Sequence, residues 1–220
     1  MIVGKDLLKA AEIRALASDY QEYASAYNTF KIKYNCVAGD CVDSLQLFGT
    51  AVNSDPSWGK LGDGIISTRY EARYVCQQLG LAGLIKAGCI GGYSTPVQVL
   101  GGLNALPSHY NDNSLMQIAV SDSYNFNGYI SPTYAPYGNY LYLGKTRTGT
   151  MVFDFPDGGV EPTIAKSLDE KIDDGKPFSG KLVQLNYGSN CGVFATNTYL
   201  PSSSTPFYPT ACPSYLFLGN

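Results

Sequence analysis

The chain has 220 residues and a formal charge of -3, with 45 % apolar residues and only 15 % charged ones. A chain of this length can bury one sizeable core, and neither its helical start nor the rest of it is basic enough to predict a nucleic-acid partner. Its 18 tyrosines and 24 glycines are typical of a β-rich secreted or cell-surface module rather than of a cytosolic enzyme.

One continuous helix is predicted over the first 34 residues, because proline is absent there and glycine occurs only at Gly4. Such a helix would be about 45 to 50 Å long, which exceeds what most globular domains need. Apolar side chains recur along it at alternating spacings of three and four residues, which places them on one face. This seam consists of Ile13, Leu16, Tyr20, Tyr23, Tyr27, Phe30 and Tyr34. We therefore divide the chain into an N-terminal helix, residues 1–35, and a head, residues 36–220.

Helices are also predicted within the head. After a turn at Gly39-Asp40 and a mostly irregular stretch over residues 41–66, Thr68 and Glu71 have the spacing of a capping box. That helix is expected to continue through residues 84 and 85, although Gly80 and Gly83 favour a kink or a break. A further capped helix is expected to begin with residues 167–170 and to end at residues 174–175.

The chain from Gly91 onward has the pattern of short strands separated by turns, which suits an antiparallel sheet with long loops. The predicted strands are residues 115–120, 140–143, 150–155, 181–187 and 192–195. The tail after Ala195 is rich in proline and serine, so we expect only Cys212 to hold it down. The predicted fold is therefore α+β, with a long N-terminal helix on an antiparallel sheet, two short additional helices and a disulfide-closed C-terminal loop.

The cysteines form three pairs of near neighbours in the sequence: Cys36 with Cys41, Cys76 with Cys89, and Cys191 with Cys212. None has the paired spacing of a zinc site, and a single histidine cannot complete a His/Cys cluster. Disulfides formed in an oxidising compartment are favoured over metal ligation. Six cysteines allow fifteen connectivities, of which pairing of neighbours is favoured, and free buried cysteines are the alternative.

Catalytic motifs are missing from the sequence. It has no nucleophile elbow and no glycine-rich nucleotide loop, and His109 has no evident orienting carboxylate. We therefore expect His109 to be an exposed or hydrogen-bonded loop residue, and the protein not to be an enzyme.

Two acidic stretches remain as candidate ion sites. Gly62-Asp63-Gly64 matches half of a calcium loop, but a turn is favoured because the upstream ligand positions do not match. Asp169, Glu170, Asp173 and Asp174 lie on the short helix. Charges early in the helix favour its dipole, whereas Asp173 and Asp174 near its end are favoured as turn formers over ligands. No cofactor is predicted, and calcium is the one ion that these patterns leave open.

Six tyrosines are concentrated in one loop-and-strand region: Tyr124, Tyr129, Tyr134, Tyr137, Tyr140 and Tyr142. Their flat amphipathic rings could stack on sugars, which makes this region a candidate carbohydrate-binding face. The favoured alternative is that tyrosine is simply a good strand and surface residue.

The start of the chain lacks the charged segment and apolar run of a secretory signal. Apolar residues nevertheless cover nearly all sides of its first turns: Ile2, Val3, Leu7, Leu8, Ala10 and Ala11. This pattern is typical of the last turns of a longer apolar segment, so we expect an export segment upstream of the sequence.

Four blocks of the sequence carry a resemblance to a known superfamily. The first is GKDLLKAAEIRALASDYQEYASAYNTFKIKYN followed by VAGD, and the others are Gly62-Asp63-Gly64, the stretch from Glu71 to Ile85, and SLDEKIDDGKPFSGK. In this order, over about residues 4 to 190, they resemble one bacterial branch of the type IV pilins and type II secretion pseudopilins. The chain departs from that branch at its start, where the prepilin-peptidase site and most of the membrane helix are missing, and at Cys36 and Cys41, which flank a turn where the branch usually has a proline.

The resemblance implies a filament subunit shaped like a lollipop, which assembles by packing of its N-terminal helix. It implies other copies of the chain and the pilus or secretion machinery as partners, with the inner membrane and periplasm before assembly and an extracellular pilus or periplasmic pseudopilus afterwards. The outer helix face that would meet neighbouring subunits consists of Leu7, Leu8, Ala11, Glu12, Arg14, Asp19 and Glu22. The segment from Cys191 to Cys212 looks like the C-terminal disulfide loop of many pilins. The rival hypothesis is a secreted carbohydrate- or surface-binding module, and an adhesive pilin would combine both functions.

Overall fold

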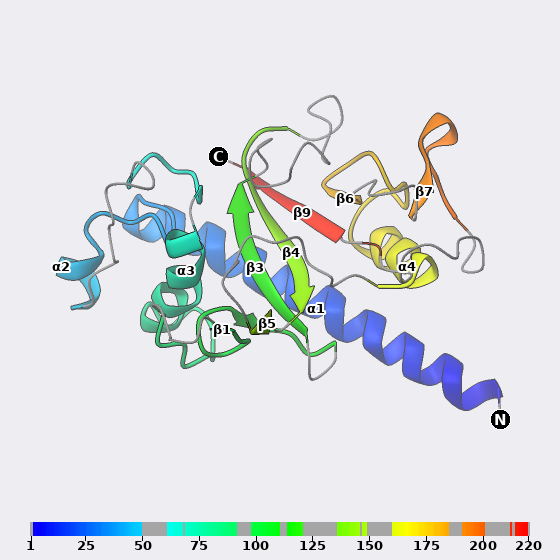
Figure 1. The fold of residues 1–220 in the computed structure, drawn as a ribbon, viewed down its shortest axis with the longest axis horizontal. Helices are drawn as coiled ribbons and strands as arrows, with labels where there is room; N and C mark the ends of the chain where they lie inside the picture. The colour runs from blue at the N-terminus through cyan, green and yellow to red at the C-terminus, as the bar shows by residue number, and fades with distance from the viewer. Residues whose placement is uncertain are drawn as a thin grey trace.

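A computed structural model of the chain describes residues 2–49, 61–67, 69–91, 98–110, 114–120, 136–145, 147–148, 160–184, 191–200, 212 and 214–219. These residues form an α+β fold in which one long N-terminal helix crosses an antiparallel sheet, with smaller helices on either side (Figure 1). The predicted fold class, long helix and antiparallel sheet are confirmed.

Helix α1 (Ile2–Tyr34) is one uninterrupted helix of 33 residues, as the sequence predicts. It ends where Asn35 adopts a left-handed backbone conformation with φ 52°, which asparagine tolerates better than most residues. Lys31 and Lys33 lie in the last turn, where positive charge is favourable at the negative end of the helix dipole.

The main sheet has five strands in the order β2-β3-β4-β9-β6, with antiparallel pairing throughout. Their bounds are β2 (Leu106–Pro107), β3 (Ser114–Val120), β4 (Asn139–Lys145), β9 (Ser214–Gly219) and β6 (Leu182–Gln184). Two small two-stranded sheets pair β1 (Gln98–Val99) with β5 (Arg147–Thr148), and β7 (Gly192–Val193) with β8 (Thr198–Tyr199).

The C-terminal tail does not depend on Cys212 alone, which corrects the expectation from its proline and serine content. Its last residues form β9, which lies between β4 and β6 inside the main sheet. Two large side chains of β9, Tyr215 and Leu216, are buried. The apolar run SYLFLG after Pro213 was the local signal for this strand.

The other predicted strands have mixed outcomes. Residues 115–120 and 140–143 lie in β3 and β4 as predicted. Of the predicted strand over 181–187, the structure shows residues 182–184 as β6, and residues 185–187 lie outside the described residues. The predicted strand over 150–155 also lies outside them. Residues 192–195 were predicted to be one strand, but β7 ends at Val193 and a 3₁₀ turn, η1 (Phe194–Thr196), follows.

The smaller helices are three rather than two in the described part of the chain. Helix α2 (Ser44–Phe48) interrupts the stretch expected to be irregular. Helix α3 (Arg69–Leu81) ends earlier than expected, because Gly83 at φ 71° closes a Schellman motif in which the Leu84 N–H donates to the Leu79 carbonyl. At its start the Glu71 carboxylate accepts the backbone N–H of Ser67, while Thr68 lies outside the described residues.

Helix α4 (Pro162–Ile172) begins five residues before the predicted start at Ser167. Pro162 occupies the first turn, where its fixed φ suits a helix and its missing N–H costs no hydrogen bond. Ser167 is therefore in the middle of this helix, and its spacing to Glu170 is not a cap.

The core lies between α1 and one face of the main sheet, flanked by α3 and α4 (Figure 1). Strands β3, β4 and β9 contribute Ile118, Leu141 and Leu216, which are register partners and face the same side. On the opposite face, aromatic rings pair across strands, with Tyr142 stacked on Tyr215 and Tyr140 beside Phe217.

Candidate functional site

Helix α1 has two halves with different environments, and the N-terminal half projects beyond the head (Figure 1). Leu7 is 67 % exposed and Leu8 66 %, and Ala11 and Arg14 are exposed as well. From Leu16 onward one face of the helix is buried in the head, and we call this part the embedded half. The projecting half therefore presents two large apolar side chains, Leu7 and Leu8, to solvent.

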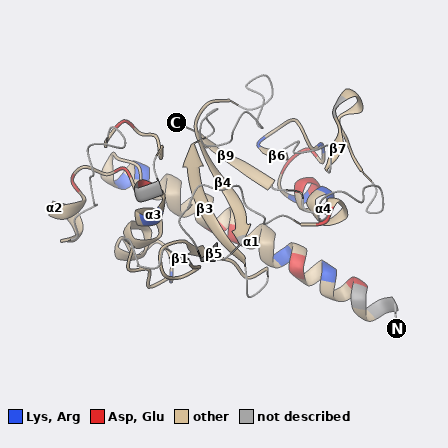
Figure 2. Ribbon diagram, in the orientation of Figure 1, with Lys and Arg blue, Asp and Glu red and all other residues tan. Residues whose placement is uncertain are grey.

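Charges of both signs lie along the projecting half, as the alternating red and blue bands near the N-terminus in Figure 2 show. In sequence order these are Asp6, Lys9, Glu12 and Arg14. The Lys9 ammonium lies 3.1 Å from the Glu161 carboxylate just before α4, and both groups are about half exposed. This exposed pair is worth little in stability.

The C-terminal half of α1 carries the tyrosine seam into the head. Five seam residues are buried: Leu16, Tyr20, Tyr23, Tyr27 and Phe30. Ile13 and Tyr34 are partly buried and pack against the same core.

Three hydroxyls of the seam make hydrogen bonds to three different strands. Tyr20 donates to the Ser214 carbonyl of β9 at 2.6 Å, and Tyr23 donates to the Pro107 carbonyl of β2 at 2.7 Å. Tyr27 accepts from the Asn139 amide of β4 at 2.8 Å. Burial raises the pKa of each of these three tyrosines above its ordinary value, so the hydroxyls keep their protons at neutral pH. The seam therefore fixes the position of α1 on the sheet as well as burying apolar surface.

The structure corrects the prediction that Asp19 belongs to the outer helix face. Asp19 is only 1 % exposed, because it lies three residues after Leu16 and four before Tyr23 and so shares their side of the helix. Its carboxylate accepts hydrogen bonds from the Ser108 hydroxyl, the His109 backbone N–H and His109 Nδ1. Glu22 remains exposed on α1 as predicted for the outer face, and Glu12 is partly exposed.

His109 therefore does have an orienting carboxylate, which the sequence did not indicate. Asp19 and His109 are 90 residues apart in the chain, and no local pattern connects them. The imidazole is 70 % exposed, so the expectation of a hydrogen-bonded, exposed loop residue agrees with its position. Ser108 bonds to Asp19 rather than to the imidazole, so these three residues do not form a nucleophilic triad.

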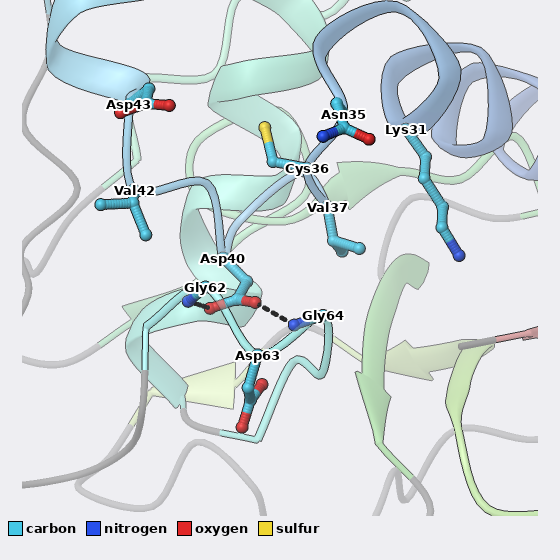
Figure 3. Close-up of a pocket in the computed structure, with 10 residues that line it drawn as sticks. All are labelled: Lys31, Asn35, Cys36, Val37, Asp40, Val42, Asp43, Gly62, Asp63 and Gly64. Carbon is cyan, nitrogen blue, oxygen red and sulfur yellow. Dashed lines mark hydrogen bonds between the residues drawn. The ribbon is translucent and has the colours of Figure 1, made fainter.

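A pocket of about 360 Å³ lies at the C-terminal end of α1 (Figure 3). Asp40 stands at its base, and its two oxygens accept the backbone N–H groups of Gly62 at 2.5 Å and Gly64 at 2.7 Å. Asp63 points away from Asp40 in Figure 3 and accepts the N–H of Ile65 at 2.9 Å. Gly62-Asp63-Gly64 is thus a hydrogen-bonded turn held by Asp40.

Burial raises the pKa of Asp40 to about 6, although the two N–H groups act in the opposite direction. The remaining lining of the pocket is mixed in charge and polarity, and consists of Lys31, Asn35, Cys36, Val37, Val42 and Asp43. Cys36 is in a disulfide, so the lining offers neither a free thiol nor a histidine as a nucleophile or base.

A second acidic group lies where α4 ends, and the carboxylate oxygens of Asp169, Asp173 and Asp174 are all within 4.8 Å of one another. Their oxygens mainly hold loops. Asp169 accepts the Tyr199 hydroxyl at 2.7 Å, Asp173 accepts the backbone N–H groups of Lys181 and Leu182, and Asp174 accepts the Ser179 hydroxyl and the N–H of Lys176.

This acidic group is the one set of three carboxylates in the described part of the chain close enough to share a cation. Burial raises the pKa of Asp169 to about 7, with the neighbouring carboxylates acting in the same direction. Glu170 takes no part, because it points to solvent beside Lys166. The bonds are those of turn formers, as the sequence favoured.

The tyrosine-rich region is not one platform in the described residues. Tyr137 is 57 % exposed, but Tyr140 and Tyr142 are buried and bond through their hydroxyls to Pro136 and Gln117. These two rings are therefore not available to stack on sugars, and their positions agree with the favoured alternative that they are strand residues. Tyr124, Tyr129 and Tyr134 lie outside the described residues.

All six cysteines form disulfides, in the favoured pairing of sequence neighbours: Cys36–Cys41, Cys76–Cys89 and Cys191–Cys212. Three disulfides indicate an oxidising environment, extracellular or periplasmic. Of the helices in the described ranges, none combines the length and apolar character needed to cross a bilayer.

Comparisons with other proteins identify no relative from which a function could be inferred. Protein-family models, curated proteins and solved structures were each compared with the chain, and none of the three comparisons gave a match.

Proposed function

We propose that this protein is a structural subunit of a type IV pilus-like filament, assembled by packing of the projecting half of α1 against other copies. The observation that carries the proposal is the division of one helix into a half embedded in the head and a half that projects with two exposed leucines. A helix that served only its own domain would not need the extra turns.

The energetics favour association through this half. Burying a leucine that is otherwise in water stabilises by about 1.5–3 kcal/mol, so Leu7 and Leu8 together offer about 3–6 kcal/mol before the entropic cost of association. Asp6, Lys9, Glu12 and Arg14 alternate in sign along the same half, and such charges set register and partner choice more than affinity. An offset contact that repeats from copy to copy does not close on itself and gives a filament.

The finer parts of the proposal come from the sequence blocks that resemble pilins and pseudopilins. We infer an exported subunit that reaches either a surface pilus or a periplasmic pseudopilus, with the cognate assembly machinery and its own copies as partners. The oxidising environment indicated by the disulfides supports this route.

The test uses the purified chain with Leu7 and Leu8 both changed to serine. We expect wild-type protein to associate with rising concentration in sedimentation velocity and to give filaments or oligomers by negative-stain electron microscopy, and the double variant to remain monomeric. The control is Ile32→Ser, which removes a side chain 85 % exposed on the embedded half of the same helix.

Two outcomes would count against the proposal. Wild-type protein that stays monomeric at every concentration would contradict self-assembly. If the control and the double variant lost association equally, the projecting half would have no special role in it. A charge-reversed chain, Arg14→Glu with Glu22→Lys, tests register separately: if it assembles as wild type does, these charges do not set it.

A further inference from the structure

Asp19 and His109 lie where α1 enters the head. Leu16 is the first fully buried residue of the helix, and Asp19 follows it within one turn. His109 comes directly after β2 and Ser108, on the loop that crosses α1 at this point. Contacts at this position therefore connect the first buried turn of the helix to β2, the edge strand of the sheet.

Both oxygens of the buried Asp19 carboxylate accept hydrogen bonds from the loop. Oδ2 of Asp19 accepts the Ser108 hydroxyl at 3.0 Å and the His109 N–H at 2.8 Å, and Oδ1 lies 2.6 Å from Nδ1 of His109. A carboxylate only accepts, so Nδ1 carries the hydrogen. The mostly exposed imidazole leaves Nε2 as the atom that exchanges its proton with water.

We propose that Asp19 and His109 form a protonation-dependent latch, which holds the loop of residues 108–110 and the edge strand β2 against α1. The hydrogen bond from Nδ1 exists in both states of the ring. With Nε2 protonated the imidazolium carries a full charge, and the bond to the buried carboxylate is charge-assisted and stronger.

The charged groups around the imidazole also favour its protonated form. On α1, Glu22 and Asp19 itself lie near the imidazole and favour its positive charge. Tyr23 on α1 and Tyr110 on the loop remain neutral, because burial raises the pKa of each. Glu12 on α1 and Glu161 before α4 act on the neighbouring Tyr110.

The pKa of His109 is accordingly raised above its ordinary 6.5, chiefly by the hydrogen bond to Asp19. A raised histidine pKa means that the extra stabilisation is fully present below pH 6.5 and is lost as the pH rises through the higher value of the folded chain. The latch is thus tight in mildly acidic solution and looser in alkaline solution.

The experiment uses the fact that His109 is the single histidine of the chain. In protein labelled with ¹⁵N-histidine, the two ring nitrogens report tautomer and protonation without ambiguity, from about pH 5 to about pH 9. We expect a wild-type pKa above 6.5 and an Asp19→Asn pKa at or below it, whereas Glu22→Gln, a matched change on the exposed side of α1, lowers it less.

The latch itself is read from hydrogen exchange at the His109 amide, expressed as a protection factor so that the intrinsic pH dependence of exchange cancels. We expect protection to fall about fivefold as the pH rises through the His109 pKa, the difference between a charge-assisted and a neutral hydrogen bond. In His109→Gln, whose exposed side chain does not titrate, the profile should be flat. This variant decides the matter if Asp19→Asn does not fold. A wild-type pKa at or below 6.5, or equal profiles for wild type and His109→Gln, would overturn the latch.

Discussion

Asn139 connects three parts of the fold through one buried side chain, so its replacement by alanine tests the packing of α1 on the sheet. Its Oδ1 accepts the Ile66 N–H at 2.8 Å, and its Nδ2 donates to the Tyr27 hydroxyl and to the Gly64 carbonyl, each at 2.8 Å. Asn139 and Ile66 are both fully buried. The amide thus links β4, α1 and the turn of residues 61–67.

The cost of Asn139→Ala follows from what each partner loses. The Ile66 N–H becomes a buried donor without an acceptor, at about 1–3 kcal/mol, and the other two hydrogen bonds contribute about 0.5–1.5 kcal/mol each. We expect a loss of about 2–6 kcal/mol in the free energy of unfolding, which is a large fraction of the 5–15 kcal/mol typical of a domain. Tyr27→Phe removes only the bond that it shares with Asn139, so it should cost about 1 kcal/mol.

Urea denaturation of the disulfide-intact chain, followed by far-UV circular dichroism, measures both variants and their combination. We expect a lower midpoint with an unchanged slope, and a double variant that loses less than the sum of the single ones because the shared bond can be lost only once. A loss below about 1 kcal/mol for Asn139→Ala, or strict additivity with Tyr27→Phe, would refute this network.

Three further predictions concern a turn, a disulfide and a buried carboxyl group. A Cβ at Gly39 would lie 2.5 Å from a carbonyl of α3, so Gly39→Ala should cost well over 2 kcal/mol in urea denaturation, whereas Gly49→Ala, at a similar positive φ in open space, should cost about 1 kcal/mol. Replacing Cys191 and Cys212 by serine opens a loop of 21 residues and should cost about 3 kcal/mol, yet amide exchange should still show protected β9 hydrogen bonds. The pKa of Asp169 is raised from 3.8 to about 7, so its folded state binds the extra proton and stability should fall as the pH rises between these values; Asp169→Asn should flatten that slope, and an unchanged slope would show that Asp169 does not titrate there.

Helix α1 shows how far local pattern extends. Continuous helix formers, a period of three and four, and the absence of proline together predict the helix and the apolar seam that it buries, because these properties depend on neighbours within two turns. The end at Tyr34 was equally local, since the turn after it contains Asn35 and a cysteine pair five residues apart. Local pattern also predicted β3 and β4, because their apolar runs are long enough to be recognised as strands.

The same local logic failed where a short segment takes its structure from distant partners. Strand β9 is six residues long and follows a stretch rich in proline and serine, yet it pairs with β4 and β6 on both sides. Its hydrogen bonds are made to residues far away in sequence, so the apolar run SYLFLG indicates a strand but not its place between β4 and β6. The sequence did not decide the early start of α4 at Pro162 or the early end of α3 at Leu81. Several prolines and glycines near these ends could each have started or ended the helix.

The sequence by itself determined the long helix, its seam and the α+β class, because each depends on residue spacing along the chain, and it favoured the disulfide pairing of neighbours without deciding it. Only the tertiary structure decided that Asp19 faces inward to His109, that Asn139 joins three elements, and that the final strand lies inside the sheet. The physical reason is that a polar side chain has several possible partners, and the choice among them is made when elements distant in sequence pack together. The projecting half of α1 depends on both. Its helical pattern is local in the sequence, but its exposure is a property of the folded chain.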